Sequence, residues 1–111
     1  MEYEDIPIVL DQFHAEDFSH VVDAAPPEDR GRIDLYVFLL QNQCLLVGRL
    51  LQFGAVSDNK YLPMLTEFLS ALEDARSTLA SPGPAMEEDL VEAQDRTGKA
   101  IEAILEMKRN E

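Results

Sequence analysis

Residues 35–53 read LYVFLLQNQCLLVGRLLQF, and this stretch decides what kind of protein the chain of 111 residues makes. It is apolar on nearly every side at helical spacing, although the whole chain has a formal net charge of −13. A helix of this kind must be covered by other helices, by a second copy of the chain or by another protein. The sequence therefore predicts a central helix that makes contacts on several sides.

Heptad spacing assigns one side of this helix to the core of the protein. On a helical wheel with about 100° per residue, one apolar stripe comprises Ile33, Val37, Leu40, Cys44, Val47 and Leu51. We expect a second set to widen this stripe on one side, namely Leu39, Leu46, Leu50 and Phe53. Gln43 also projects into the apolar side, where it either finds a partner and sets the helix register or lies at a helix crossing open to water.

A polar strip on the remaining side of the helix carries the candidate partner-binding residues. Two large apolar residues, Phe38 and Leu45, lie two turns apart on this strip. Apolar anchors among polar side chains are typical of protein interfaces, in which arginine and aromatic residues are enriched. The candidate binding residues are Phe38, Gln41, Asn42, Leu45, Arg49 and Gln52.

Three interpretations of this strip stay open at the level of sequence. The acidic residues 1–25 could fold over Phe38 and Leu45 and bury them. Alternatively, the strip is the seam of a homodimer, or it binds a different protein. The surplus of apolar surface on this helix favours the homodimer as the state of the protein.

Turn residues, including Pro26-Pro27 and Gly54, separate the helices of the chain. Three main helices are predicted, over 27–53, 59–80 and 84–109. The apolar stripe of the second comprises Tyr61, Leu65, Phe68, Leu72, Ala75 and Leu79. The apolar face of the third comprises Leu90, Thr97, Ile101, Ile104 and Leu105, and its polar side offers the i,i+4 ion pairs Glu92–Arg96 and Asp95–Lys99.

The first 25 residues are the least regular part of the sequence. Pro7 is expected to break any helix early, and the apolar spacing from Asp11 onward predicts one short helix that ends before the two prolines. Together the segments predict an all-α fold in a single domain, 1–111. Residues 27–111 form a small antiparallel helical bundle, and residues 1–25 form a short acidic N-terminal helical segment.

Acidic residues are concentrated at the two ends of the chain. Residues 1–29 hold nine Asp or Glu and no Lys or Arg, residues 30–80 hold five of each sign, and residues 81–111 hold eight acids and four bases. Such a field repels nucleic-acid phosphates and anionic lipid, and it favours a basic protein partner. The acidic start lacks an apolar signal-peptide core, and polar residues interrupt the central stretch, so we expect a cytoplasmic protein without a membrane span.

One cluster of potential metal ligands lies near the N-terminus, where His14, Glu16, Asp17, His20 and Asp23 fall within ten residues. On a continuous helix, Glu16, His20 and Asp23 would share a face. No metal-binding, nucleophile or phosphate-binding motif supports this cluster or any other group. We therefore expect no metal, no cofactor and no enzymatic activity.

The pattern as a whole predicts a non-catalytic protein–protein interaction module that binds through its apolar second helix. It would serve as an adaptor, a chaperone-like protein or an inhibitor, with acidic ends that favour a basic partner. The alternative is an acidic nucleic-acid mimic that blocks a DNA- or RNA-binding protein. In that case the acidic first 29 residues and the row Glu88, Asp95, Glu102 and Glu106 would present carboxylates to it.

Overall fold

A computed structural model describes residues 5–56, 58–81 and 83–111 of the chain. These residues form α-helices and one short 3₁₀ helix, with no strand among them. The elements are α1 (Ile6–Ala15), α2 (Ser19–Ala24), α3 (Pro27–Gln52), η2 (Asn59–Tyr61), α4 (Leu62–Ala80) and α5 (Met86–Arg109). The predicted all-α bundle is confirmed, and its three main helices lie within a few residues of their predicted bounds.

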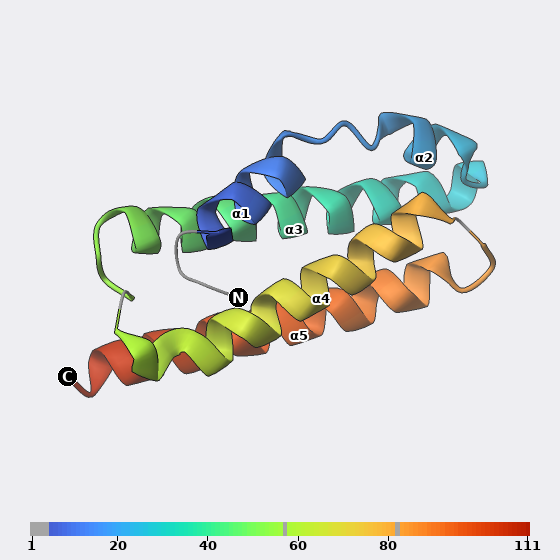
Figure 1. The fold of residues 1–111 in the computed structure, drawn as a ribbon. Coiled ribbons are helices and arrows are strands. Elements are labelled where there is room, and N and C mark those ends of the chain that lie inside the picture. Colours follow the sequence, from blue (N-terminus) through green and yellow to red (C-terminus); the bar gives the residue numbers. More distant parts are fainter. Residues whose placement is uncertain (1–4, 57, 82) are drawn as a thin grey trace.

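The helices form an elongated bundle of 46 × 23 × 18 Å. Figure 1 shows α1 and α2 end to end along α3, and α4 and α5 packed together as a pair. Consecutive long helices reverse direction, as an antiparallel bundle requires. As a result α3 and α5, which pack against each other, run in the same direction.

Local sequence signals set the ends of the long helices. Pro27 lies in the first turn of α3, where its missing N–H leaves no hydrogen bond unmade. Gly54 ends this helix with a φ of +71°, a left-handed conformation that favours glycine. The N–H groups of Gly54 and Ala55 donate to the carbonyls of Leu51 (3.0 Å) and Leu50 (2.9 Å), which is a Schellman motif.

The N-terminal segment differs from its prediction. Pro7 occupies the first turn of α1 and begins a helix there, because a proline ring is compatible with that position. The single helix expected from Asp11 is instead two, since α1 ends at Ala15 and α2 begins at Ser19. The rings of Phe13 and Phe18, 5.4 Å apart, pack across the break.

The core contains the stripes that the heptad spacing predicts. All six residues predicted for the second stripe, Tyr61 in η2 and five on α4, are buried, as are Ile33, Val37, Leu40, Cys44 and Val47 on the inner face of α3, whereas Leu51 of the same predicted stripe is only half-buried. The N-terminal helices add Ile6, Leu10, Phe13 and Val21. On α5 the prediction is correct for Leu90, Thr97, Ile101 and Ile104 and wrong for Leu105, which is exposed.

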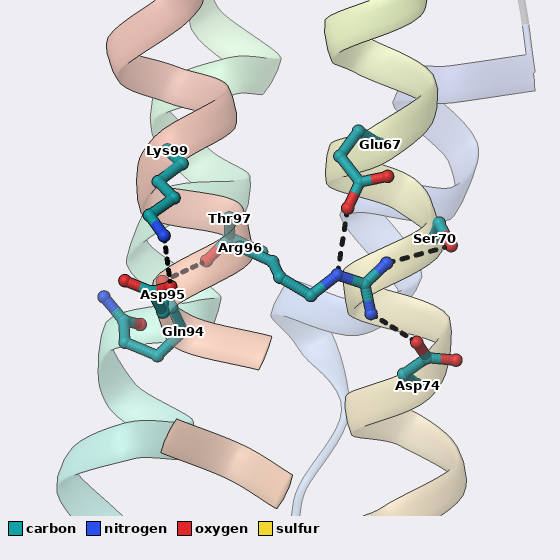
Figure 2. Close-up of polar contacts among 8 residues, drawn as sticks. All are labelled: Glu67, Ser70, Asp74, Gln94, Asp95, Arg96, Thr97 and Lys99. Carbon is teal, nitrogen blue, oxygen red and sulfur yellow. Dashed lines mark hydrogen bonds and ion pairs between the residues drawn. The ribbon is translucent and has the colours of Figure 1, made fainter. Parts of the chain in front are cut away.

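Arg96 links α5 to α4 (Figure 2). Its guanidinium donates to Glu67 Oε1 (2.9 Å), Asp74 Oδ2 (2.5 Å) and Ser70 Oγ (3.2 Å), all on α4. The predicted Glu92–Arg96 pair is therefore wrong, because the side chain extends to the neighbouring helix. The predicted Asp95–Lys99 pair is confirmed, with 2.9 Å between its charged atoms.

A polar contact joins α3 to α5 inside the bundle. The hydroxyl of the buried Thr97 donates to Gln43 Oε1 at 2.6 Å. This contact confirms that Gln43 finds a hydrogen-bond partner between the helices. Nearby, Gln94 Oε1 is buried without a partner among the described residues.

Candidate protein-binding surface

One face of α3 is apolar and exposed along the length of the helix. The exposed fractions are 77% for Phe53, 59% for Phe38, 51% for Leu35, 43% for Leu46 and 40% for Leu45. Asn42 and Arg49 are exposed between them on the helical wheel. We call this set the outer face of α3, and it comprises Leu35, Phe38, Asn42, Leu45, Leu46, Arg49 and Phe53.

The neighbours of α3 explain why this face is open. Helices α1 and α2 pack on one side of α3, and α5 packs on another. Gln41 faces α1, and its Nε2 donates to the carbonyls of Glu16 (2.8 Å) and Phe13 (3.3 Å) at the end of that helix. Gln43 faces α5 through Thr97. The inner side of α3 faces the core, so the outer face is the side that none of the described elements covers.

This arrangement contradicts one of the three interpretations of the strip. The described part of the N-terminal segment, residues 5–25, packs along α3, but it leaves Phe38 and Leu45 exposed. The segment instead contacts Gln41 through both its side chain and its backbone. The Gln41 side chain donates to the Phe13 carbonyl, and the Gln41 carbonyl accepts a hydrogen bond from His14 Nδ1 (3.2 Å). Gln41 is therefore a structural contact to α1.

The other predicted binding residues come together on or beside the outer face. Asn42 donates from Nδ2 to the Phe38 carbonyl (2.8 Å), which holds its amide against the helix between Phe38 and Leu45. Arg49 is exposed, and so is Gln52 at the edge toward α1. The surface therefore unites Phe38, Asn42, Leu45 and Arg49, with Gln52 at its rim.

The structure adds three residues that the sequence assigned elsewhere or left unassigned. Leu46 and Phe53 were expected to widen the core stripe, and Leu35 was given no role. All three are exposed, because α5 packs close to Gln43 and covers only the adjacent edge of α3. For Leu46 and Phe53 the available signal was their seven-residue spacing, which places them on a common line of the helix without saying which helix covers that line.

Arg49 has an unusual electrostatic position. Within residues 5–56, 58–81 and 83–111, each of the other Lys and Arg side chains makes an ion pair or a hydrogen bond. Arg49 makes neither in that part of the chain. An exposed and unpaired guanidinium in a chain of net charge −13 is available to a carboxylate of another molecule.

A groove of about 560 Å³ lies between α1 and α3 along the edge of the outer face. Its lining includes Asp11, His14, Gly48 and Arg49, with Cys44 at its base. Burial raises the pKa of the Cys44 thiol to about 12, so the group is protonated at neutral pH and is a poor nucleophile. The groove therefore extends the contact surface and contains no activated nucleophilic thiol.

The N-terminal histidines and carboxylates do not share one helix face, contrary to what a continuous helix would give. Glu16 lies between α1 and α2, where it pairs with Arg76 at 3.4 Å. Asp17 Oδ1 accepts a hydrogen bond from the Ser19 N–H (2.9 Å), and hydrogen bonding from the side chain and then the backbone of Ser19 lowers the pKa of Asp17. No group of three or more metal-ligating side chains comes together in the described part of the chain.

None of the described helices combines the length and apolar character needed to cross a membrane. Comparisons with protein-family models, with curated proteins and with solved structures found no match to this chain.

Proposed function

We propose that this protein is a non-catalytic protein–protein interaction module that binds through the outer face of α3. One observation carries this proposal: large apolar side chains, four on α3 and Phe53 at its C-terminal cap, are between 40% and 77% exposed along a single face. Exposed apolar area of this kind is unfavourable in water and becomes favourable when a partner covers it. Asn42 and Arg49 give the same face polar groups that set orientation and specificity.

The distribution of charge supports a partner with a basic region. The outer face belongs to residues 30–80, in which acids and bases balance, while acids dominate both ends of the chain. An apolar contact at α3 combined with acidic flanks suits an adaptor, a chaperone-like protein or an inhibitor of a basic protein. The partner would gain affinity from α3 and a faster approach from the charges.

The alternative of a nucleic-acid mimic receives weaker support from the acidic row on α5. Two of its four carboxylates already pair within the chain, Asp95 with Lys99 and Glu106 with Arg109. A mimic works by presenting unpaired charges to a nucleic-acid site. The exposed apolar face of α3 has no role in that activity.

The test is a binding comparison with immobilised protein at low and high salt, in a lysate that also contains an untagged copy of the chain. Wild type is compared with Phe38→Asp/Leu45→Asp and with the charge variant Glu88→Lys/Glu102→Lys. We expect the Phe38→Asp/Leu45→Asp variant to lose the retained proteins, while high salt and the charge variant leave them bound. Circular dichroism verifies that each variant is folded.

The opposite pattern would contradict the proposal. If retention falls steeply with salt and with charge reversal on α5, and survives the change at Phe38 and Leu45, the acidic surface is the binding site. The mimic hypothesis would then replace the interaction through α3.

A further inference from the structure

Four residues of α3 are arranged symmetrically along the helix. Asp34, Phe38, Leu45 and Arg49 are separated by four, seven and four positions. In two antiparallel helices related by a twofold axis, a residue i that lies opposite a residue j places j opposite i as well. With the axis midway between Phe38 and Leu45, Phe38 lies opposite Leu45 of the second copy, and Asp34 lies opposite its Arg49.

The charges at the two ends of this pattern have no ion-pair partners among the described residues of their own chain. Asp34 and Arg49 are both exposed, and neither makes an ion pair within the described ranges. They are 15 positions apart on one straight helix, which is about 22 Å at 1.5 Å per residue. The two side chains therefore cannot reach each other within one chain, whereas antiparallel pairing brings them together twice.

The surface has a hollow on each side of the midpoint of this pattern. A shallow hollow of about 340 Å³ lies next to Phe38 and is lined by Gly31, Asp34 and Leu35 among others. The groove lined by Leu45, Gly48 and Arg49 lies on the other side of the midpoint. Each hollow adjoins a glycine, so a large side chain of a second helix has space at both places. Leu45 of a second copy would enter the first hollow and its Phe38 the second.

We propose that the occupant of the outer face of α3 is a second copy of this chain, packed antiparallel about a twofold axis near Gln41 and Asn42. The seam contains two Phe38–Leu45 contacts and is closed at each end by an Asp34–Arg49 ion pair. This inference rests on the proposed function, because it takes the same face as the binding surface, and it names a second copy of the chain, in place of a basic protein, as what covers that face. Charge complementarity favours the second copy as the occupant. Arg49, the guanidinium of this face that makes no ion pair with any described residue, lies opposite the Asp34 carboxylate of that copy.

The test uses charge exchange and measures mass by light scattering and sedimentation equilibrium. Asp34→Arg places two arginines opposite each other at both ends of the seam, and Arg49→Asp places two aspartates there. We expect wild type to dimerise and each single variant to be a folded monomer. An equal mixture of the two variants pairs Arg with Asp at both ends, so we expect a heterodimer.

The double variant Asp34→Arg/Arg49→Asp restores opposite charges in one chain, and we expect it to form a homodimer again. Glu73→Arg provides the matched control, because Glu73 is exposed on α4 away from the seam and undergoes the same charge change. This control is expected to dimerise like wild type. Circular dichroism distinguishes dissociation from unfolding in each variant.

Cross-linking determines the orientation of the two helices. Asp34→Cys and Arg49→Cys chains should form a disulfide with each other in the mixture and not within either separate variant. Cys44 does not compete, because it is buried and its thiol pKa is raised to about 12. Self-linking of each separate variant would show parallel packing and overturn the proposal.

Two further outcomes would overturn it. A wild-type protein that stays monomeric at millimolar concentration excludes the second copy as occupant, and the binding of a different protein through Phe38 and Leu45 would then still support the proposed function. If wild type is a dimer and the Asp34 and Arg49 variants have the same dimeric mass, the seam lies elsewhere in the molecule.

Discussion

Helices α3 and α5 are neighbours that run in the same direction and have similar lengths, 26 and 24 residues, yet they differ in their outer surfaces. On α5 the large apolar residues that remain exposed are Val91 and Leu105, and the rest of its outer surface is mostly charged. Several of these charges are paired, as in Asp95–Lys99 and Glu106–Arg109. On α3 and at its C-terminal cap five large apolar residues are exposed, and the one arginine among them makes no ion pair with any described residue.

The difference separates what folding requires from what remains for binding. Both helices bury one apolar stripe, and that stripe is sufficient to hold each of them in the bundle. The second apolar face of α3 gains nothing from folding of the single chain. It becomes favourable only when another molecule removes it from water.

The largest expected effect comes from truncating the two faces of α3 separately. Leu40→Ala removes a fully buried side chain and should lower the free energy of unfolding by about 2–5 kcal/mol, from lost burial and the cavity that remains. Leu45→Ala, on the 40% exposed side chain, should change the unfolding free energy of the monomer by less than about 1 kcal/mol. Urea unfolding at low protein concentration measures both values.

Equal losses for Leu40→Ala and Leu45→Ala would show that the outer face belongs to the core of the single chain. The comparison between α3 and α5 would then fail, and so would the proposed binding surface.

A smaller effect is expected at the contact that joins the two helices. Thr97→Val removes the hydroxyl that donates to Gln43 and leaves a partly buried amide oxygen without this donor, so we expect a loss of about 0.5–1.5 kcal/mol. Gln43→Leu/Thr97→Val removes both polar groups and should recover most of that loss. Thermal or urea unfolding of the two single variants and the double variant gives the coupling between the two residues.

If the losses from the single variants simply add in the double variant, Gln43 and Thr97 do not act as a pair. The register of α3 against α5 would then depend on the apolar contacts alone.

The smallest effect concerns the charged end of α5. Glu111 accepts hydrogen bonds from Lys60, Tyr61 and Lys108, and these contacts lower its side-chain pKa from 4.5 to about 2. A pKa that is lower in the folded than in the unfolded state stabilises the protein above pH 4.5, and the contribution disappears as the pH falls toward 2. We expect Glu111→Gln to lower the melting temperature slightly at neutral pH.

The pH dependence distinguishes this ion-pair effect from a packing effect. The difference in melting temperature between wild type and Glu111→Gln should be largest above pH 4.5 and should vanish near pH 2. A difference that stays constant over that range would mean that the charge of Glu111 does not contribute to stability.

Much of the bundle could be predicted from local patterns. The seven-residue spacing of Leu65, Leu72 and Leu79 places them on one buried line, because helical periodicity is independent of which helix lies opposite. Gly54 predicted the end of α3, because its backbone conformation favours glycine. The N-terminal break between Ala15 and Ser19 was missed, because the apolar spacing from Asp11 onward fits one helix and no glycine or proline lies at the break to signal it.

The binding surface could be predicted only in part, for a related reason. Phe38 and Leu45 stood out because they are apolar among polar neighbours on their own helix. Leu46 and Phe53 did not, because they continue an apolar region and their exposure depends on how far α5 covers α3. Gln41 was assigned to the surface from its place on the helical wheel. Its hydrogen bonds to the end of α1 join residues far apart in the chain, so the helical pattern could not reveal them.

The sequence by itself determined the number, length and core stripes of the long helices, since these follow from a 3.6-residue period and from glycine and proline at the helix ends. It also determined that α3 has more apolar surface than one contact can bury. Only the tertiary structure decided which part of that surface stays open. The placement of α1, α2 and α5 around α3 is set by contacts between residues far apart in the chain, and helical periodicity contains no information about them.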